Sequence, residues 1–535
     1  MTATTDAPQS QGLSHRQIMS ILSGLLLGMF LASLDQTIVS TAMRTIADKL
    51  NGQTAQAWVT TAYLVTSTVS TPLYGKLSDL YGRKPFYLFA IGIFLVGSAL
   101  CGQAHSIYEL AAYRALQGLG AGGLLSLAFA IIGDLVAPRQ RPKYQAYFTS
   151  VFATSSVLGP VLGGFFAGQS TILGVTGWRW IFYVNVPIGA AAFYVVWHNL
   201  KLPRKREEHR IDYLGAALLS SSVVPFLLLA EKGREWGWGS PTSLALMAIA
   251  VVSLGLFIPR QSRLGEDAIL PLRIFRDPVF SVVSVIATLV GMVMFGGLVL
   301  MPLYLQIVRQ ESPTDAGLMM TPFMVGLMGT SLITGRLMQK TGRYKIFPIF
   351  GTAILFVGML LFSTLKVDTP IPQAMAYMVV TGIGLGLTMQ MLVISVQNSL
   401  PPQDMGLSTS AVTFFRSMGG TLGAAVSLAV LFGTVVGNIK DRLLDSPYKA
   451  FANQVTGAKL DDTSGLFDKI PAGMKHLILE GFADSMHTVF LVVAVLVIPA
   501  FVLTFFIKEV PLRTTGGIAA AREEGELAMA ESAVV

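Results

Sequence analysis

The segment GKLSDLYGRK, residues 75–84, returns later in the chain as GRLMQKTGRYK, residues 335–345. The first glycines of the two copies are 260 positions apart, and each copy follows a long apolar segment. A second pair of similar segments, QGLGAGG at 117–123 and TGIGLGL at 381–387, is 264 positions apart. Two matches at nearly the same offset indicate that the chain consists of two related halves.

The composition of the chain is that of an integral membrane protein. Of its 535 residues, 53% are hydrophobic and 13% are charged, whereas soluble domains carry about 25% charged residues. The mean hydropathy is +0.61. A single cysteine, Cys101, excludes an intrachain disulfide and a cysteine-based metal site. The net charge of +8 does not require a nucleic-acid partner, because Lys and Arg concentrate in the cytoplasmic loops of membrane proteins.

Fourteen apolar segments approach the roughly 20 residues that a helix needs to cross a bilayer. They lie near 18–43, 55–75, 86–104, 107–133, 144–168, 178–199, 212–230, 241–258, 279–306, 315–338, 346–364, 372–398, 407–435 and 484–507. We therefore expect an all-α polytopic membrane protein with a six-helix half at 18–199, two inserted helices at 212–258 and a six-helix half at 279–507. Repeated halves are the construction of many secondary transporters, whose substrate sites lie between them.

The distribution of Lys and Arg predicts the orientation. If the N-terminus is cytoplasmic, the inner segments carry 23 of these residues, and the outer loops carry 7 when the long loop at 436–483 is left out. The positive-inside rule then places both tails, 1–17 and 508–535, in the cytoplasm. We expect the protein to reside in the cell (inner or plasma) membrane. The loop at 436–483 is interpreted either as a simple covering loop or as short amphipathic helices on the outer surface.

Five motifs resemble those of the major facilitator superfamily. GKLSDLYGRK resembles its inner-loop motif, in which Gly75, Asp79, Gly82, Arg83 and Lys84 fill the characteristic positions. AAYRALQGLGAG, residues 111–122, resembles its fourth-span motif and contains Arg114. LGPVLGG, residues 158–164, resembles the fifth-span motif of antiporters and contains Gly159, Pro160, Gly163 and Gly164, although Ser155 stands where that motif usually has a glycine.

The two remaining motifs specify a branch of the superfamily. LDQTIVSTAM at 34–43 and WRWIFYVNVPIG at 178–189 resemble first-span and sixth-span motifs of the fourteen-span drug:proton antiporters. The resemblance covers roughly residues 15–510. It implies the major facilitator fold with two inserted helices and export driven by proton exchange.

Each motif also has a physical interpretation. Glycines permit a tight turn at the membrane face, and Asp79 can cap a helix or pair with a cation in one conformation only, which makes it a gate. In the second copy Gln339 replaces the aspartate, so the ionic gate is expected on one side only. Arg83 and Lys84 are alternatively plain positive-inside anchors.

The fifth-span motif combines small residues with a helix-kinking proline. Its glycines let a neighbouring helix approach closely, and Pro160 bends the span. The resemblance implies that this bend seals the inner path when the protein faces outward, while ordinary helix packing is the alternative.

Asp35 is the one carboxylate in the first apolar segment, where it costs about 2.5–3.5 kcal/mol on insertion scales. It lies roughly 25 Å along its span, and Arg114 lies roughly 10 Å into a span of opposite direction. Both are therefore expected at similar depth in the outer half of the membrane, close to each other. A nearby guanidinium and burial act oppositely on the proton affinity of a carboxylate, so we predict that Asp35 exchanges the proton and Arg114 tunes it. A permanent ion pair that only orients helices is the alternative.

Other polar residues inside the spans are candidate substrate contacts. These are Tyr63, Gln306, Gln390 and Gln397, each of which is alternatively a helix–helix hydrogen bond. Arg416 either binds an anionic group or extends toward the inner interface. The cavity is expected to be apolar and rich in Met and Phe, which suits varied ligands. One central acid suggests one proton per cycle.

The sequence thus favours a proton-coupled exporter of amphipathic or cationic drugs and toxic compounds, working by alternating access. The alternatives are a dedicated exporter of one natural product or lipid, and a non-transporting membrane sensor or scaffold. No nucleophile–base cluster, metal-ligand spacing or nucleotide-binding motif occurs, so we expect neither an enzyme nor a cofactor, with the proton gradient as energy source. The expected partners are the lipid bilayer, protons and small substrates, and the expected state is a monomer.

Overall fold

The computed structural model describes residues 15–52, 55–200, 212–454 and 471–512. Within these residues, thirteen helices are long and apolar enough to cross a membrane by length and composition. The remaining expected span, near 55–75, is the helix α2 (Ala57–Tyr81), which is rich in Thr and Ser and therefore less apolar. Its hydroxyl groups bond to carbonyls one turn earlier, as Thr61 does to Ala57 at 2.9 Å, so they need no water. The structure therefore confirms the all-α polytopic architecture.

The helices follow the expected order along the chain. The first half contains α1 (His15–Lys49), α2, α3 (Arg83–Cys101), α4 (Ile107–Leu135), α5 (Arg141–Gly168), a small hairpin of β1 (Thr171–Ile172) and β2 (Val175–Thr176), η2 (Gly177–Arg179), α6 (Trp180–Tyr183) and α7 (Asn185–Asn199). The inserted pair is α8 (Tyr213–Trp236) and α9 (Pro241–Leu264), followed by the short helices η3 (Gly265–Asp267) and η4 (Leu272–Arg276).

The second half begins after this linker. It contains α10 (Pro278–Leu303), the π-helix η5 (Tyr304–Val308), α11 (Pro313–Met319), α12 (Thr321–Thr341), α13 (Ile346–Ser363), α14 (Ile371–Ser399), η6 (Pro402–Asp404), α15 (Met405–Leu444), η7 (Lys449–Gln454) and α18 (Ala472–Thr504).

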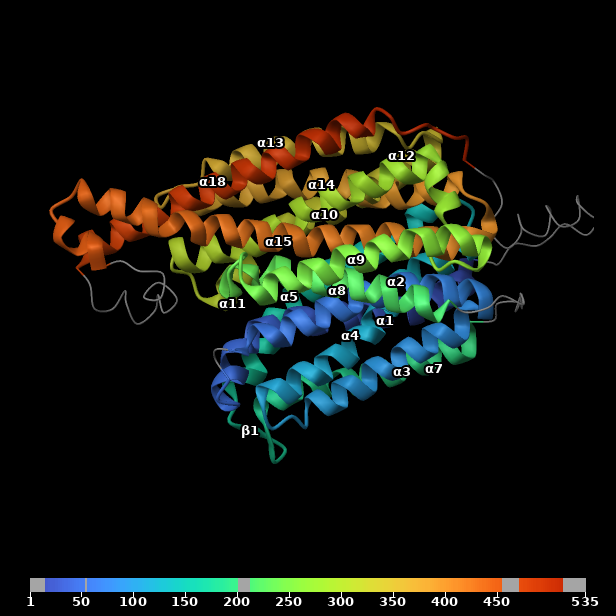
Figure 1. Ribbon diagram of the computed structural model, residues 1–535, viewed down its shortest axis with the longest axis horizontal. Coiled ribbons are helices and arrows are strands. Elements are labelled where there is room, and N and C mark those ends of the chain that lie inside the picture. The colour runs from blue at the N-terminus through green and yellow to red at the C-terminus, as the bar shows by residue number, and fades with distance from the viewer. Residues whose placement is uncertain (1–14, 53–54, 201–211, 455–470, 513–535) are drawn as a thin grey trace, which may run out of the picture.

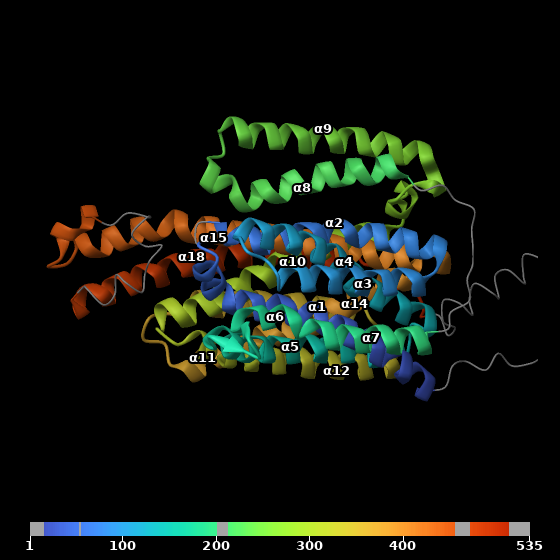
Figure 2. The same ribbon diagram turned by 90° about the horizontal axis from the view of Figure 1, so that it is seen from below.

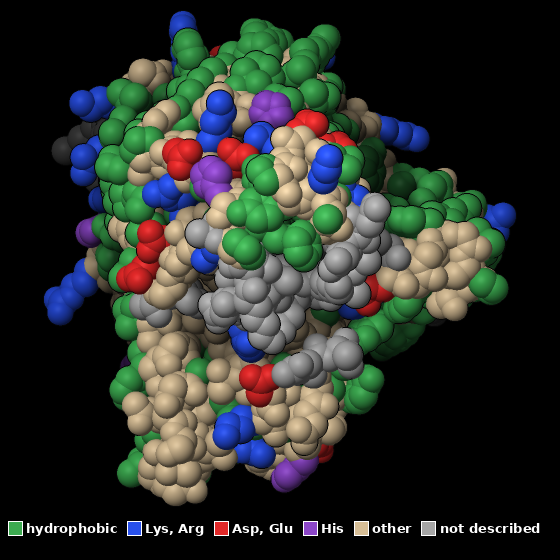
Figure 3. All heavy atoms as spheres, turned by 90° about the vertical axis from the view of Figure 1, so that its left-hand side faces the viewer, with side chains coloured by type: hydrophobic (Ala, Val, Ile, Leu, Met, Phe, Trp, Pro, Cys, Tyr) green, Lys and Arg blue, Asp and Glu red, His purple; other side chains and the backbone are tan. Residues whose placement is uncertain are grey.

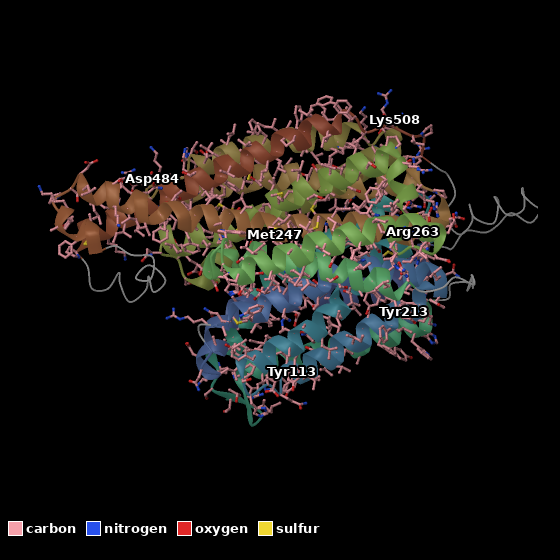
Figure 4. All side chains as sticks on the ribbon, in the orientation of Figure 1. Tyr113, Tyr213, Met247, Arg263, Asp484 and Lys508 are labelled. Atoms are coloured by element: carbon pink, nitrogen blue, oxygen red, sulfur yellow. The ribbon has the colours of Figure 1, made fainter. Side chains whose placement is uncertain are left out.

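The two halves lie side by side as bundles of nearly parallel helices, the first half in blue to teal and the second in yellow to red (Figure 1). They meet where α2 packs on α15 and where α5 packs on α12. The inserted pair stands outside the bundle, with α8 between α9 and the rest of the protein (Figure 2). We call the end that carries Tyr213 and Lys508 the termini end, and the opposite end, near Asp484, the hairpin end (Figure 4).

The hairpin end carries a protruding pair of helices. The segment 436–483, expected as an outer loop, is partly helical, because α15 continues to Leu444 and α18 begins at Ala472. Arg442 of α15 joins the two helices by ion pairs to Glu480 at 2.7 Å and to Asp484 at 2.9 Å. The middle of the segment, 455–470, lies outside the described residues.

The surface is apolar around the bundle and charged at its ends. Figure 3 shows Lys, Arg, Asp, Glu and His side chains gathered over the hairpin end, with hydrophobic side chains along the flanks. On α9 the exposed residues include Leu244, Val251 and Leu256, each more than half exposed, at 59%, 61% and 58%. A water-soluble protein seldom exposes apolar area on this scale, whereas a bilayer requires it. The protein is therefore a polytopic membrane protein.

Candidate functional site

Asp35 is fully buried in the first half and holds together three helices. Its carboxylate forms an ion pair with Arg114 of α4. Its Oδ1 accepts hydrogen bonds from Gln117 Nε2 of α4 and from Asn185 Nδ2 of α7, both at 2.8 Å. The predicted proximity of Asp35 and Arg114 is thus found, and the carboxylate of α1 is paired with one cation and two amide donors.

Arg114 is buried as completely as Asp35 and is held from several sides. Its guanidinium lies 4.0 Å from the ring centroid of Tyr63, and its Nη1 also donates to Gln117 Oε1 at 2.8 Å. The Tyr63 hydroxyl donates to the carbonyl of Ala32 at 3.3 Å. Tyr63, predicted as a substrate contact or a helix–helix bond, therefore serves as a platform for Arg114 and a link to α1.

Two members of this cluster, Gln117 and Asn185, escaped the sequence analysis although both lie inside quoted motifs. Asn185 also donates to Ser98 Oγ at 3.0 Å, while its own Oδ1 is buried without a donor. The signal that could have found them is their chemistry, because a buried amide in an apolar span needs polar partners. Asp35 is the polar partner that both amides find.

The antiporter-like motif of α5 lies directly against α1, close to Asp35. A Cβ placed on Gly159 would lie 2.1 Å from Thr37 Oγ1, and one on Gly163 would lie 2.7 Å from the Ile38 carbonyl oxygen. These two glycines therefore allow a contact that no larger residue permits. Gly164 is exposed, and Pro160 lies inside α5, where its ring approaches Gly317 of α11 in the second half.

At the termini end, the predicted inner-loop motif joins the two halves. Asp79 of α2 forms an ion pair with Arg83 and accepts a hydrogen bond from the backbone N–H of Leu407, in the first turn of α15, at 2.7 Å. Arg83 Nε also pairs with Asp134 of α4 at 2.7 Å. Gly82, with φ of +98°, makes the turn between α2 and α3 that places Arg83 there.

Two other motif residues at this end have simpler environments. Lys84 donates to the Trp197 carbonyl at 2.5 Å and lies over its ring, which ties α3 to α7 within the first half. Gly75 faces Ser410 of α15, because a Cβ at Gly75 would lie 2.5 Å from the Ser410 side chain. Gly75 thus permits the close approach of α2 and α15.

Gln390 and Gln397 of α14 bond to the first half. Gln390 Nε2 donates to Thr149 Oγ1 of α5 at 2.9 Å. Gln397 Oε1 accepts from the buried Arg141 Nη1 at 3.1 Å, and its Nε2 donates to the Phe129 carbonyl at 3.3 Å. Their interpretation as helix–helix hydrogen bonds fits this structure, in which they add to the closure of the termini end.

The linker after the inserted helices reaches the same end. Arg273 of η4 binds Asp404, at the start of α15, through two hydrogen bonds of 2.8 and 2.9 Å. Lys76 of α2 donates to the Glu266 carbonyl at 2.5 Å. Burial raises the pKa of Asp404 above its usual range, and the Arg273 guanidinium opposes that rise. The linker thus contacts both halves beside the Asp79 contact.

Two predicted residues have no polar partner in the part of the chain that the structure describes. Arg416 is half-buried in α15 and makes neither a hydrogen bond nor an ion pair with any described residue. Gln306 is half-buried in the π-helix η5, a type of element that is frequent at functional sites. Neither side chain lines the apolar recess described below.

An apolar recess lies within the second half, among α10, α12, α13 and α14. Its lining is Val293, Met294, Gly297, Met301, Met320, Phe323, Phe362, Met378, Thr381 and Leu385. The recess encloses only about 10 Å³, which is room for a water molecule and not for a drug-sized ligand. The recess and the Asp35 cluster lie in different halves.

Comparisons with known proteins agree with this architecture. The sequence profile of the Major Facilitator Superfamily matches residues 25–424. The multidrug transporter protein MdtP of Bacillus subtilis is 34% identical over 512 residues, which are 92% of this chain and 93% of that protein. An uncharacterized MFS-type transporter of Mycobacterium tuberculosis, Rv1877, is 37% identical over 493 residues, 92% of this chain and 70% of that protein.

A solved structure shows the same fold. The proton:xylose symporter XylE superposes with a TM-score of 0.57 at 14% identity, covering 88% of this chain and 99% of that one. The family match over residues 25–424 and the 34% identity to MdtP show that this chain belongs to the major facilitator superfamily of membrane transporters.

Proposed function

We propose that the protein exports amphipathic or cationic compounds by exchanging them for protons across the cell membrane, with both termini in the cytoplasm. The observation that carries this proposal is Asp35, a carboxylate buried in a membrane helix and paired with Arg114. An ionisable group inside a membrane bundle is costly and marks a transport pathway. The multidrug transporter MdtP, similar over nearly its whole length, supports the substrate class.

The orientation follows from charge. With the termini end in the cytoplasm, the Asp79–Leu407 and Arg141–Gln397 contacts close the inner side of the bundle. The arrangement then corresponds to a state whose inner gate is shut, which suits the release of substrate to the outside and the uptake of a proton there. The protein works as a monomer in the bilayer and uses the proton gradient with no further cofactor.

The ionised cluster explains how a proton can change the structure. When Asp35 is ionised, Arg114, Gln117 and Asn185 all point hydrogen atoms at its carboxylate. A proton on Asp35 removes the charge that holds Arg114, so α1 and α4 lose their strongest contact. Because Thr37, two residues after Asp35, bonds to the Ser155 carbonyl at 3.0 Å, the change reaches α5 through α1. Substrate and proton thus favour opposite arrangements of α1.

The test uses proteoliposomes with an imposed pH gradient and a cationic dye such as ethidium. The wild type is expected to move dye only with the gradient, and Asp35→Asn is expected to lose this while remaining folded by size-exclusion and melting measurements. Asp48→Asn, at the exposed end of the same helix, is the matched control.

Each other result has a definite meaning. Dye transport that survives Asp35→Asn would exclude Asp35 as the coupling group. A wild type that moves no dye of any kind would contradict the multidrug proposal and favour a dedicated substrate, such as one natural product or lipid. If the effect of the protein on its host cell requires neither Asp35 nor transport, the protein is a non-transporting sensor or scaffold.

A further inference from the structure

The segment that follows α18 is docked on the termini end of the second half. Residues 505–512, which we call the strap, bond to the loop between α12 and α13 and to the last turn of α14. Figure 4 marks this place with Lys508. Ile507 is fully buried, and Leu512 packs against the apolar core of the second half. The strap therefore has a defined site on the second half.

The loop between α12 and α13 holds the strap through Tyr344 and Lys345. The backbone N–H of Tyr344 donates to Glu509 Oε1 at 2.9 Å, and the Tyr344 hydroxyl accepts from the N–H of Val510 at 2.8 Å. Lys345 Nζ donates to the Phe505 carbonyl at 2.8 Å. Tyr344 is fully buried beneath these contacts, so it forms the centre of the docking site.

The last turn of α14 connects the strap to the closure of the termini end. Asn398 is buried there, and its Nδ2 donates to the carbonyls of Val510 and Pro511 at 3.1 and 3.2 Å. The preceding residue, Gln397, contacts the first half, because its Oε1 accepts from Arg141 Nη1 at 3.1 Å. The same helical turn is thus bonded both to the strap and to the first half.

The docking site lies at the position where the first half has an ionic cluster. In the first half, Arg83 pairs with Asp79 and Asp134. The repeat offsets of 260 and 264 residues place the equivalent positions of the second half at Gln339, Arg343 and Asn398. Both carboxylates are therefore replaced by amides, and Arg343 is exposed whereas Arg83 is buried.

This replacement is what the strap requires. The amide nitrogen of Asn398 provides hydrogen atoms for two carbonyl groups of the strap, whereas an ionised carboxylate only accepts hydrogen bonds. An aspartate at 398, like Asp134 in the first half, would direct its oxygens at the carbonyl oxygens of Val510 and Pro511. The second copy of the cluster has thus lost the groups that make an ionic contact and has the groups that bind a backbone segment.

From these contacts we propose that the second copy of the inner-loop motif is a docking site for the chain's own strap, and that the docked strap keeps the termini end closed. The strap holds the last turn of α14 where Gln397 reaches Arg141 of the first half. When the strap leaves, that turn loses its support and the contact between the halves weakens, so the termini end opens more often. This inference does not depend on what the protein transports or on proton exchange.

The first measurement detects docking of the strap. Amide hydrogen exchange of the purified full-length protein in nanodiscs reports how often residues 505–512 detach. We expect Glu509→Ala to speed this exchange roughly 2- to 10-fold, as for the loss of one hydrogen bond, and Asn398→Asp to speed it more. Lys508→Ala, which keeps the backbone carbonyl of this exposed residue, is the matched control and is expected to change nothing. If neither Glu509→Ala nor Asn398→Asp speeds the exchange, the docking site is wrong.

The second measurement detects closure of the termini end. A cysteine introduced by Ser410→Cys in a Cys101→Ala background is buried beside Gly75, where the two halves meet, so its labelling rate reports opening. We expect Glu509→Ala to raise this rate by up to about the same factor as the exchange of the strap, and Lys508→Ala to leave it unchanged. A strap that exchanges faster in Glu509→Ala while the labelling rate stays the same would overturn the effect on closure.

These measurements also separate this inference from a loss of folding and from the proposed function. Glu509 is exposed, so Glu509→Ala keeps the test decisive even if Asn398→Asp fails to fold, which size-exclusion and melting measurements detect. Neither measurement contains a substrate, so a failure of dye transport does not affect them. Conversely, an unaltered labelling rate in Glu509→Ala says nothing against Asp35 as the coupling group.

Discussion

Asp79 of α2 accepts a hydrogen bond of 2.7 Å from the backbone N–H of Leu407, at the first turn of α15. A carboxylate of the first half thus meets the positive end of a helix dipole in the second half. Arg83 pairs with Asp79 and Asp134 and so fixes the position of that carboxylate. In the proposed transport cycle, these two helices separate when the termini end opens.

We expect Asp79→Asn to favour opening at the termini end. A charge at a helix terminus contributes about 0.3–2 kcal/mol, so the open population should rise roughly 2- to 30-fold. The measurement is the labelling rate of a cysteine at Ser410, which is buried beside Gly75, in a Cys101→Ala background. Gln339→Ala, at the equivalent position of the second copy, is expected to change the rate little. An unaltered rate in Asp79→Asn would show that the contact does not hold the gate.

Asn185 is expected to support the transport step that depends on Asp35. Its amide donates to Asp35 Oδ1 at 2.8 Å, and a hydrogen bond to a charged group contributes about 1.5–3 kcal/mol. Asn185→Leu removes this donor, so the rate of gradient-driven dye transport should fall roughly 10- to 100-fold. Asn185→Gln, which keeps an amide, should lose less. An unchanged rate in Asn185→Leu would remove Asn185 from the coupling cluster.

Alanine substitutions at Gly159 and Gly164 of α5 are expected to have different effects on stability and transport. A methyl group at Gly159 would overlap Thr37 of α1, and overpacking of this kind costs about 1–3 kcal/mol. Gly159→Ala should therefore lower both the melting temperature and the transport rate. Gly164→Ala introduces the same methyl group at an exposed position and should change neither. Equal effects of the two substitutions would mean that helix propensity, and not the contact with α1, governs this segment.

Arg416 is expected to matter for ligands and not for the fold. It is half-buried without a hydrogen bond or ion pair among the described residues, and an unpaired cation in a membrane helix is costly. Arg416→Gln should leave the melting temperature equal or higher while reducing transport of compounds that carry an acidic group. Arg442→Gln, which loses two ion pairs, is the comparison that should melt lower. A large destabilisation in Arg416→Gln would indicate a structural role.

Much of the fold was predictable because length and hydropathy specify a membrane span almost independently of its neighbours. The pairing of Asp35 with Arg114 followed from their depths along two spans of opposite direction. The sequence predicted that Gly159 allows a neighbouring helix to approach closely. It did not indicate that this helix is α1.

The remaining features depend on which face of a helix is buried, and a single sequence does not contain this information. Asn185 and Gln117 are ordinary amides until α1, α4 and α7 bring them to one carboxylate. Glu231 of α8, which is hydrogen-bonded to Thr61 of α2, was overlooked because the seventh segment was expected to end near residue 230, whereas α8 continues to Trp236. The seventh segment was defined by its apolar residues, and it therefore ended at residue 230, directly before Glu231.

The 40-residue helix α15 begins beside the Asp79 contact and continues without interruption to the ion pairs of Arg442. At about 1.5 Å per residue it is roughly 60 Å long. If this helix tilts as a rigid rod at one membrane face, its protruding tip moves further at the other face. A fluorophore attached to that tip, at the hairpin end, would then report whether the termini end is open or closed.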